Sequence, residues 1–144
     1  MNEEIKIYSD GGARGNPGPS ASAFVVFKNN KILFKNSKYF GIKTNNQAEY
    51  TALMMAYKWL EKNNISKYKI YFYLDSELVV KQMQGIFKIK NNQLKVLFKK
   101  IKYYENIIEK RNNNLRHILI KREFNTIADK LVNKSIDENM KNFT

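Results

Sequence analysis

The chain has 144 residues, 43% of them hydrophobic and 13% aromatic, which suits one domain with a sizeable core and excludes a disordered chain. Its net charge of +13 favours a polyanionic partner, although a Lys-rich surface without any such partner would give the same composition. The absence of cysteine excludes disulfides and thiolate metal sites.

No apolar stretch of the sequence is long enough to span a bilayer, and the first nine residues lack the apolar core of a signal peptide. We therefore expect a cytoplasmic monomer without a membrane partner, formed by a single domain over residues 1–144.

The first third of the chain predicts three strands. Residues 3–9 alternate polar and apolar side chains, and residues 20–28 and 31–40 also read as strands. Two asparagines at 29–30 predict a two-residue hairpin between the latter pair, because Asn tolerates a positive φ. A Gly-rich segment over residues 11–18 predicts a tight turn; it lacks the Gly-Lys-Ser/Thr ending of a nucleotide-binding P-loop and leads into a strand rather than a helix.

The rest of the chain alternates helices with strands. Thr44 predicts a helix start, since Gln47 three residues later completes a capping box. The resulting order, β-β-β-α-β-α-α-β-α, predicts an α/β fold in which helices pack on a five-stranded mixed sheet whose first three strands are antiparallel. The later elements are a strand at 69–74, helices at 76–84 and 93–110, a strand at 115–120 and a helix at 125–140.

Four carboxylates, Asp10, Glu49, Asp75 and Asp129, stand at strand ends or helix starts. In an α/β domain such positions can converge at one end of the sheet, where ligand sites form. Four crowded acidic groups repel one another unless cations neutralise them, so the arrangement predicts a divalent-metal site. Each residue also has a structural alternative: Asp10 as a turn residue, Asp75 as a helix cap, and the other two as first-turn acids.

The sequence contains four notable blocks: Tyr-Ser-Asp-Gly-Gly-Ala-Arg-Gly-Asn-Pro-Gly (8–18), Thr-Asn-Asn-Gln-Ala-Glu (44–49), Leu-Asp-Ser (74–76) and Asn-Thr-Ile-Ala-Asp (125–129). Together they resemble type 1 ribonuclease H. The blocks follow that family's order and cover nearly the whole chain. The resemblance implies a five-stranded mixed sheet with helices on both faces. It also implies an endonuclease that hydrolyses the RNA strand of RNA/DNA hybrids and leaves 5′-phosphate and 3′-hydroxyl ends.

The resemblance implies a role for each carboxylate. Asp10 would bridge two metal ions, Glu49 and Asp75 would hold the ion on the leaving-group side, and Asp129 would hold the ion that carries the attacking water. The expected ions are two Mg²⁺, with Mn²⁺ as a substitute, because Mg²⁺ prefers hard oxygen ligands and paired ions about 4 Å apart suit an in-line displacement.

The resemblance also implies substrate contacts. Asn16 and Thr44 would seat a DNA-strand phosphate, while Asn45 and the backbone at Gly11 and Gly12 would reach sugars and base edges. Thr44 equally fits a helix cap, and the two roles are compatible.

The chain departs from the best-known members and resembles a short archaeal and bacterial form. It lacks their basic, Trp-containing protrusion, and its only tryptophan, Trp59, is expected in the core. The loop before Asp129 has no histidine, which leaves Arg122 and Glu123 as candidate auxiliary residues, while His117 is expected to be structural. The resemblance to this form implies double-stranded RNA as a further substrate. The rival interpretations are an inactive nucleic-acid-binding module and a DNA-cutting integrase or transposase core.

Overall fold

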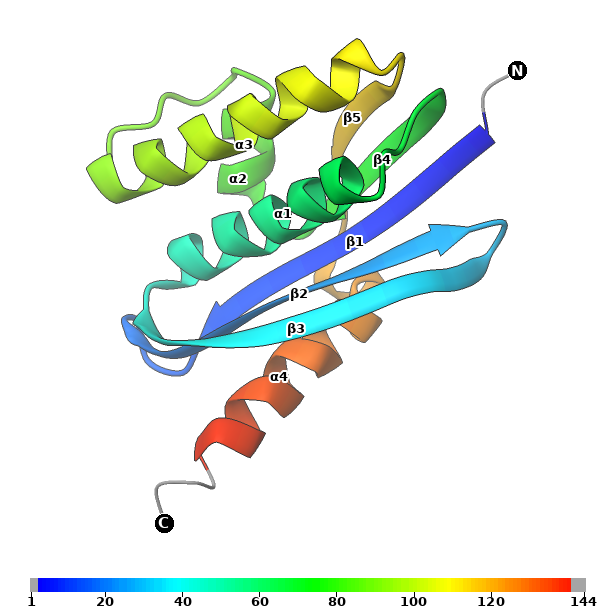
Figure 1. Ribbon diagram of the computed structural model, residues 1–144. Coiled ribbons are helices and arrows are strands. Elements are labelled where there is room, and N and C mark those ends of the chain that lie inside the picture. The colour runs from blue at the N-terminus through cyan, green and yellow to red at the C-terminus, as the bar shows by residue number, and fades with distance from the viewer. Residues whose placement is uncertain (1–2, 141–144) are drawn as a thin grey trace.

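The computed structural model describes residues 3–140, which form one five-stranded mixed sheet in the order β3-β2-β1-β4-β5 (Figure 1). Strand β2 pairs antiparallel with both β1 and β3, whereas β4 pairs parallel with both β1 and β5. This topology confirms the predicted fold class. The strands are β1 (Glu3–Ala13), β2 (Gly18–Lys28), β3 (Lys31–Lys43), β4 (Tyr68–Leu74) and β5 (Asn114–Leu119).

Helices cover both faces of the sheet. Helix α1 lies on β1 and β2, with α3 packed against it, and α4 lies on the opposite face (Figure 1). A short 3-10 helix, η1, precedes α4 and was not predicted from the sequence. None of the helices within residues 3–140 is long and apolar enough to cross a membrane. The helices are α1 (Asn45–Lys62), α2 (Glu77–Met83), α3 (Asn92–Lys110), η1 (Arg122–Phe124) and α4 (Thr126–Met140).

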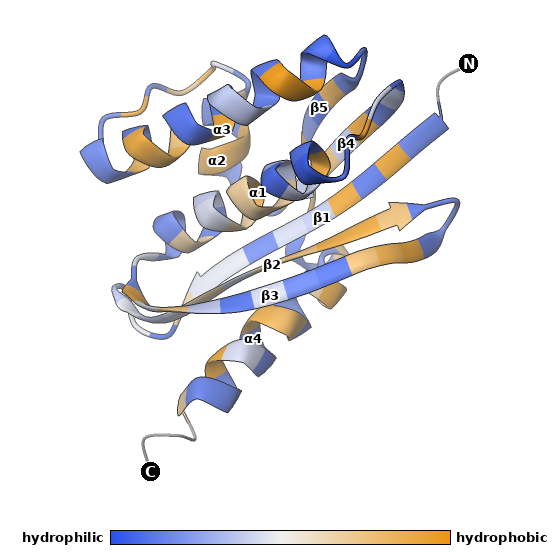
Figure 2. Cartoon of the chain, viewed as in Figure 1, coloured by the Kyte–Doolittle hydropathy of each residue, from blue (hydrophilic) through white to orange (hydrophobic). Residues whose placement is uncertain are grey.

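The two faces of the sheet bury cores of different size, because alternate residues of a strand point to opposite faces. Along β2, Phe24 and Val26 enter the large core beneath α1, whereas Ala21 and Ala23 meet α4. Figure 2 shows the same alternation of hydrophobic and hydrophilic residues along the first half of β1. The core beneath α4 is small, and its buried members are Ala21, Ala23, Val132 and Ile136.

Several local features match the sequence prediction. Asn29 and Asn30 form the β2–β3 hairpin with φ of 53° and 62°. Thr44 is the N-cap of α1 and forms the reciprocal capping box with Gln47. Trp59 is partly buried against the large core, where its ring stacks on Phe34 with centroids 5.6 Å apart.

The Gly-rich segment differs from the prediction of a turn over residues 11–18. Strand β1 continues to Ala13, with Gly11 paired to Ser22 and Gly12 to Ala21. The reason is packing rather than turn geometry: a Cβ added at Gly11 would lie 2.2 Å from the backbone carbon and oxygen of Ala48 in α1. Glycine at this position therefore allows the helix to approach the strand backbone directly.

This contact predicts opposite outcomes for two adjacent glycines. Gly11→Ala should lower the free energy of unfolding by roughly 3 kcal/mol or more, because backbone atoms of α1 cannot move aside independently. Gly12→Ala is the matched control, since its Cβ would lie 3.6 Å from Val132, an ordinary contact, and should change stability by less than about 1 kcal/mol. Urea unfolding of both variants measures the difference, and equal stabilities would contradict the packing explanation.

Candidate active site

Three of the four predicted carboxylates converge at the carboxyl end of β4, beside the neighbouring strand β1. Tyr8 of β1 pairs in parallel with Tyr73 of β4, so Asp10 and Asp75, each two residues further along, lie beside each other. Glu49 reaches them from the first turns of α1. One carboxylate oxygen from each of Asp10, Glu49 and Asp75 lies within 4.8 Å of the others.

Burial and mutual repulsion make the ionised form of these carboxylates unfavourable unless a cation is bound. Burial, followed by the charge of Asp75, raises the pKa of Asp10 to about 7. Burial, followed by the charges of Asp10 and Asp75, also raises the pKa of Glu49 well above its usual value. One oxygen of Glu49, Oε2, is buried without a hydrogen-bond partner among the described residues. Such an oxygen is costly unless an ion or a proton satisfies it, and an all-oxygen donor set fits a hard divalent cation.

Asp129 stands beside this cluster rather than within it. It belongs to the first turn of α4, and its side chain is 31% exposed. Arg122 of η1 forms an ion pair with it, with 3.6 Å between Nη2 and Oδ1. The charge of Asp129 nevertheless contributes to the raised pKa of Asp10, which places the two carboxylates within electrostatic reach of each other.

Asn125 is the residue that the sequence analysis quoted in a motif but assigned no role. Its side chain is buried, and Nδ2 donates hydrogen bonds to the backbone oxygen of Ser9 at 2.8 Å and to Oδ2 of Asp75 at 3.1 Å. Its own backbone oxygen accepts from the N–H of Asp129 at 3.1 Å. Asn125 therefore connects β1, the end of β4 and the start of α4. An asparagine at a helix start ordinarily indicates only a cap, so the sequence carries no signal for these contacts across the sheet.

The predicted substrate residues connect the β1–β2 turn to the start of α1. The Asn45 backbone N–H donates to Oδ1 of Asn16 at 3.0 Å, and Oδ1 of Asn45 accepts from the N–H of Ala13 at 2.8 Å. Thr44 Oγ1 accepts from the N–H of Gln47 at 3.1 Å as the helix cap. These contacts fix the turn close to the helix that carries Glu49.

The comparisons with known proteins identify the family. The family model described as RNase H matches residues 2–141. The chain belongs to the RNase H family. It is 31% identical over 136 residues to the bifunctional protein Rv2228c of Mycobacterium tuberculosis, covering 93% of this chain and 36% of that protein. It is 30% identical to ribonuclease HI of Halobacterium salinarum, covering 93% of this chain and 65% of that protein. The chain thus spans about a third to two thirds of these relatives.

Solved structures agree with the family and the fold. LC11-RNase H1 in complex with an RNA/DNA hybrid is 40% identical, with a TM-score of 0.88 over 94% of this chain and 99% of that chain. The RNase H1 of Halobacterium salinarum is 29% identical, with a TM-score of 0.80 over 94% and 98% of the two chains.

The two candidate auxiliary residues of this RNase H domain differ in their surroundings. Arg122 contacts Asp129, whereas Glu123 is exposed and forms no ion pair or hydrogen bond through its side chain within residues 3–140. His117 belongs to β5, where it pairs with Phe72, and is not a member of the Asp10, Glu49 and Asp75 cluster. Its ring stacks on Phe72 with centroids 5.0 Å apart, and Nε2 shares a 2.8 Å hydrogen bond with the hydroxyl of Tyr57. Burial lowers the pKa of His117 to about 4, which suits the structural role expected for it.

The raised pKa of Asp10 predicts how stability depends on pH without metal. Between about pH 4 and pH 7 the folded protein holds a proton on Asp10 that the unfolded chain has released, so stability falls as the pH rises through this window. Asp10→Asn should remove this loss and be more stable than the wild type at pH 8, by roughly 2–4 kcal/mol. Denaturant unfolding at several pH values, with a chelator present, measures the difference.

The control for this measurement is Glu138→Gln, because Glu138 is 62% exposed at the far end of α4. Its stability difference from the wild type should stay nearly constant over the same pH range. If the stability difference between Asp10→Asn and the wild type were equally independent of pH, the raised pKa of Asp10 would be contradicted.

Proposed function

We propose that this chain is a metal-dependent endoribonuclease that hydrolyses the RNA strand of RNA/DNA hybrids and leaves 5′-phosphate and 3′-hydroxyl ends. The observation that carries the proposal is the convergence of Asp10, Glu49 and Asp75 within 4.8 Å at the carboxyl end of β4 in an RNase H domain. The likeness to LC11-RNase H1, whose structure contains an RNA/DNA hybrid, supports the choice of substrate.

The proposed cofactor is a pair of Mg²⁺ ions, with Mn²⁺ as a substitute. Asp10 would contact both ions, Glu49 and Asp75 the first and Asp129 the second. Two bound divalent ions supply an activated water and neutralise the charge on the departing 3′ oxygen. The residues themselves provide only oxygen ligands, the class that Mg²⁺ and Mn²⁺ prefer. The raised pKa values of Asp10 and Glu49 support the proposal, because bound divalent cations would offset both the burial and the mutual repulsion that raise them.

The proposed substrate contacts lie along the β1–β2 turn and the start of α1. Asn16 and Thr44 would seat a phosphate of the DNA strand, and Asn45 with the backbone of Gly11 and Gly12 would read sugars and base edges. The hydrogen bonds between Asn45 and both Asn16 and Ala13 support this, because they hold the two elements in a fixed relation. Only the 2′-hydroxyl separates RNA from DNA sugars, so selectivity requires polar groups placed as rigidly as these.

The deciding experiment compares three labelled duplexes of one sequence: RNA/DNA hybrid, double-stranded RNA and double-stranded DNA. With Mg²⁺ or Mn²⁺ we expect cleavage of the RNA strand of the hybrid, slower cleavage of double-stranded RNA, no cleavage of DNA, and loss of all cleavage with a chelator. An uncut hybrid, or a DNA duplex cut equally well, would contradict the proposal.

Asp10→Asn tests the metal ligands. The variant should lose hybrid cleavage by a factor of at least about 1,000 while binding hybrid with nearly unchanged affinity, because it removes a metal ligand without changing the shape of the side chain. Gel-shift binding and cleavage rates measured on one preparation separate the two effects. Cleavage at the wild-type rate would exclude Asp10 from the metal site.

The loop before Asp129 predicts a smaller effect. We expect Glu123→Gln to slow multiple-turnover cleavage by about 2- to 10-fold, since it removes a charge that can order water near the site. Arg122→Gln is the companion variant, because Arg122 forms the ion pair with Asp129. Single-turnover rates distinguish the steps: an unchanged rate assigns Glu123 to product release, and a slowed rate assigns it to the chemical step. Wild-type turnover at every pH would make Glu123 an ordinary surface residue.

A further inference from the structure

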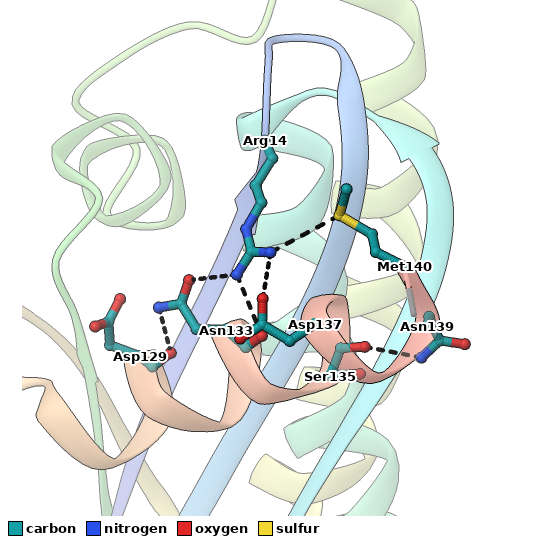
Figure 3. A network of polar contacts seen from close by, with 7 residues as sticks. All are labelled: Arg14, Asp129, Asn133, Ser135, Asp137, Asn139 and Met140. Carbon is teal, nitrogen blue, oxygen red and sulfur yellow. Dashed lines mark hydrogen bonds and ion pairs between the residues drawn. The ribbon is translucent and has the colours of Figure 1, made fainter. Parts of the chain in front are cut away.

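Arg14 connects the β1–β2 turn to the second half of α4 (Figure 3). Its Nη1 forms an ion pair with Asp137 and lies 3.8 Å from the sulfur of Met140. Its Nη2 donates to both the backbone oxygen and Oδ1 of Asn133, each at 3.3 Å. The planar guanidinium thus contacts successive turns of the helix at once, a geometry that a lysine cannot reproduce.

The same contacts continue to Asp129. Nδ2 of Asn133, whose Oδ1 accepts from Arg14, donates to the backbone oxygen of Asp129 at 3.0 Å (Figure 3). One turn of α4 therefore separates Asn133, which the guanidinium contacts, from the backbone of Asp129, whose carboxylate stands outside the three-residue cluster. The hydrogen-bonded path runs from Arg14 through Asn133 to Asp129.

At its other end, Arg14 belongs to a turn that is itself fixed. Its backbone N–H donates to the oxygen of Pro19 at 2.9 Å, and the neighbouring Ala13 donates to Asn45 at the start of α1. The turn therefore keeps its place relative to β1, which carries Asp10, and to α1, which carries Glu49. Through this turn, Arg14 holds α4 in a fixed position relative to β1 and α1, the two elements that carry the buried carboxylates.

Polar contacts matter for the position of α4 because the apolar core that holds this helix against the sheet is small. Val132 and Ile136 of this helix are buried in the core that it shares with Ala21 and Ala23, Leu131 packs at its border, and the only other buried apolar side chain of α4 is the small Ala128. Asn125 fixes the first turn of α4, and Arg14 fixes the second half. Asp129 lies between these two polar anchors.

We propose that Arg14 is a positioning residue that sets Asp129 against Asp10 by fixing α4 to the β1–β2 turn. The inference rests on the proposed function of the carboxylate site and deepens it. Arg14 touches neither metal nor substrate in this role. A small displacement of a ligand-bearing helix weakens ion binding and slows catalysis strongly, because both depend on placement within about 0.5 Å.

A general loss of stability is not the expected effect. The Arg14 side chain is 38% exposed and that of Asp137 is 54% exposed, and exposed ion pairs contribute little to folding. The matched control is Lys134→Gln, which removes one positive charge and another exposed ion pair of α4, the 3.9 Å contact between Lys134 and Glu138. That pair does not reach the turn.

The experiment compares the wild type with Arg14→Gln, Arg14→Lys and Lys134→Gln. In a calorimetric titration with Mn²⁺ and no nucleic acid, the weaker of the two binding steps should have about 3- to 10-fold lower affinity in Arg14→Gln than in the wild type. The kcat on RNA/DNA hybrid should fall by a similar factor, while KM changes less than about 2-fold. Arg14→Lys should lie between Arg14→Gln and the wild type, and all three variants should unfold at similar temperatures.

Two results would overturn the proposal. The first is Mn²⁺ binding and kcat in Arg14→Gln equal to those of Lys134→Gln. The second is a rise in KM alone, which would assign Arg14 to substrate binding. If the wild type failed to cleave hybrid, the proposed function would fall, and the Mn²⁺ titration would still decide the role of Arg14.

Discussion

The close contact between α1 and the backbone of Gly11 is the constraint on which the site depends. Helix α1 lies so near β1 that no side chain fits between them, and Ser22 Oγ donates to the Ala48 oxygen at 2.6 Å in the same place. Because Glu49 is the next residue along the helix, this contact brings its carboxylate to Asp10. A wider spacing would let water enter between the two carboxylates and reduce their interaction with a bound cation.

The surroundings of this carboxylate cluster hold the least satisfied polar groups of the described chain. Three buried side-chain atoms there lack hydrogen-bond partners, namely Ser9 Oγ, Glu49 Oε2 and Asn125 Oδ1. Unsatisfied buried polar atoms destabilise a fold, and their concentration beside Asp10 and Asp75 is typical of a site organised for a ligand rather than for stability. The large core beneath α1 offsets this cost, since it buries apolar side chains of β1, β2, β4 and three helices.

Features with local causes were predictable from the sequence. The Asn29-Asn30 hairpin and the Thr44 cap follow from the conformations that single residues prefer, so pattern and position sufficed. The approach of Asp10 to Asp75 also follows, because neighbouring parallel strands run toward the same end of the sheet, where ligand sites form. The extension of β1 through Gly11, the contacts of Asn125 across the sheet, and the reach of Arg14 to α4 were not predictable. The extension of β1 comes from its pairing with β2, whereas the approach of Ala48 to Gly11 and the contacts of Asn125 and Arg14 join residues more than 30 positions apart in the chain.

The shallow core beneath α4 has a consequence for the motions of the domain. Opening of α4 exposes few apolar side chains, so this helix should detach locally while the sheet, α1 and α3 stay folded, and its amide hydrogens should exchange earlier than those of β1 and β4. In that open form Asp10, Glu49 and Asp75 remain together and Asp129 departs. The partly opened domain would keep three of the four carboxylates together and lose Asp129, so local opening of α4 alone would leave the proposed ligand set incomplete.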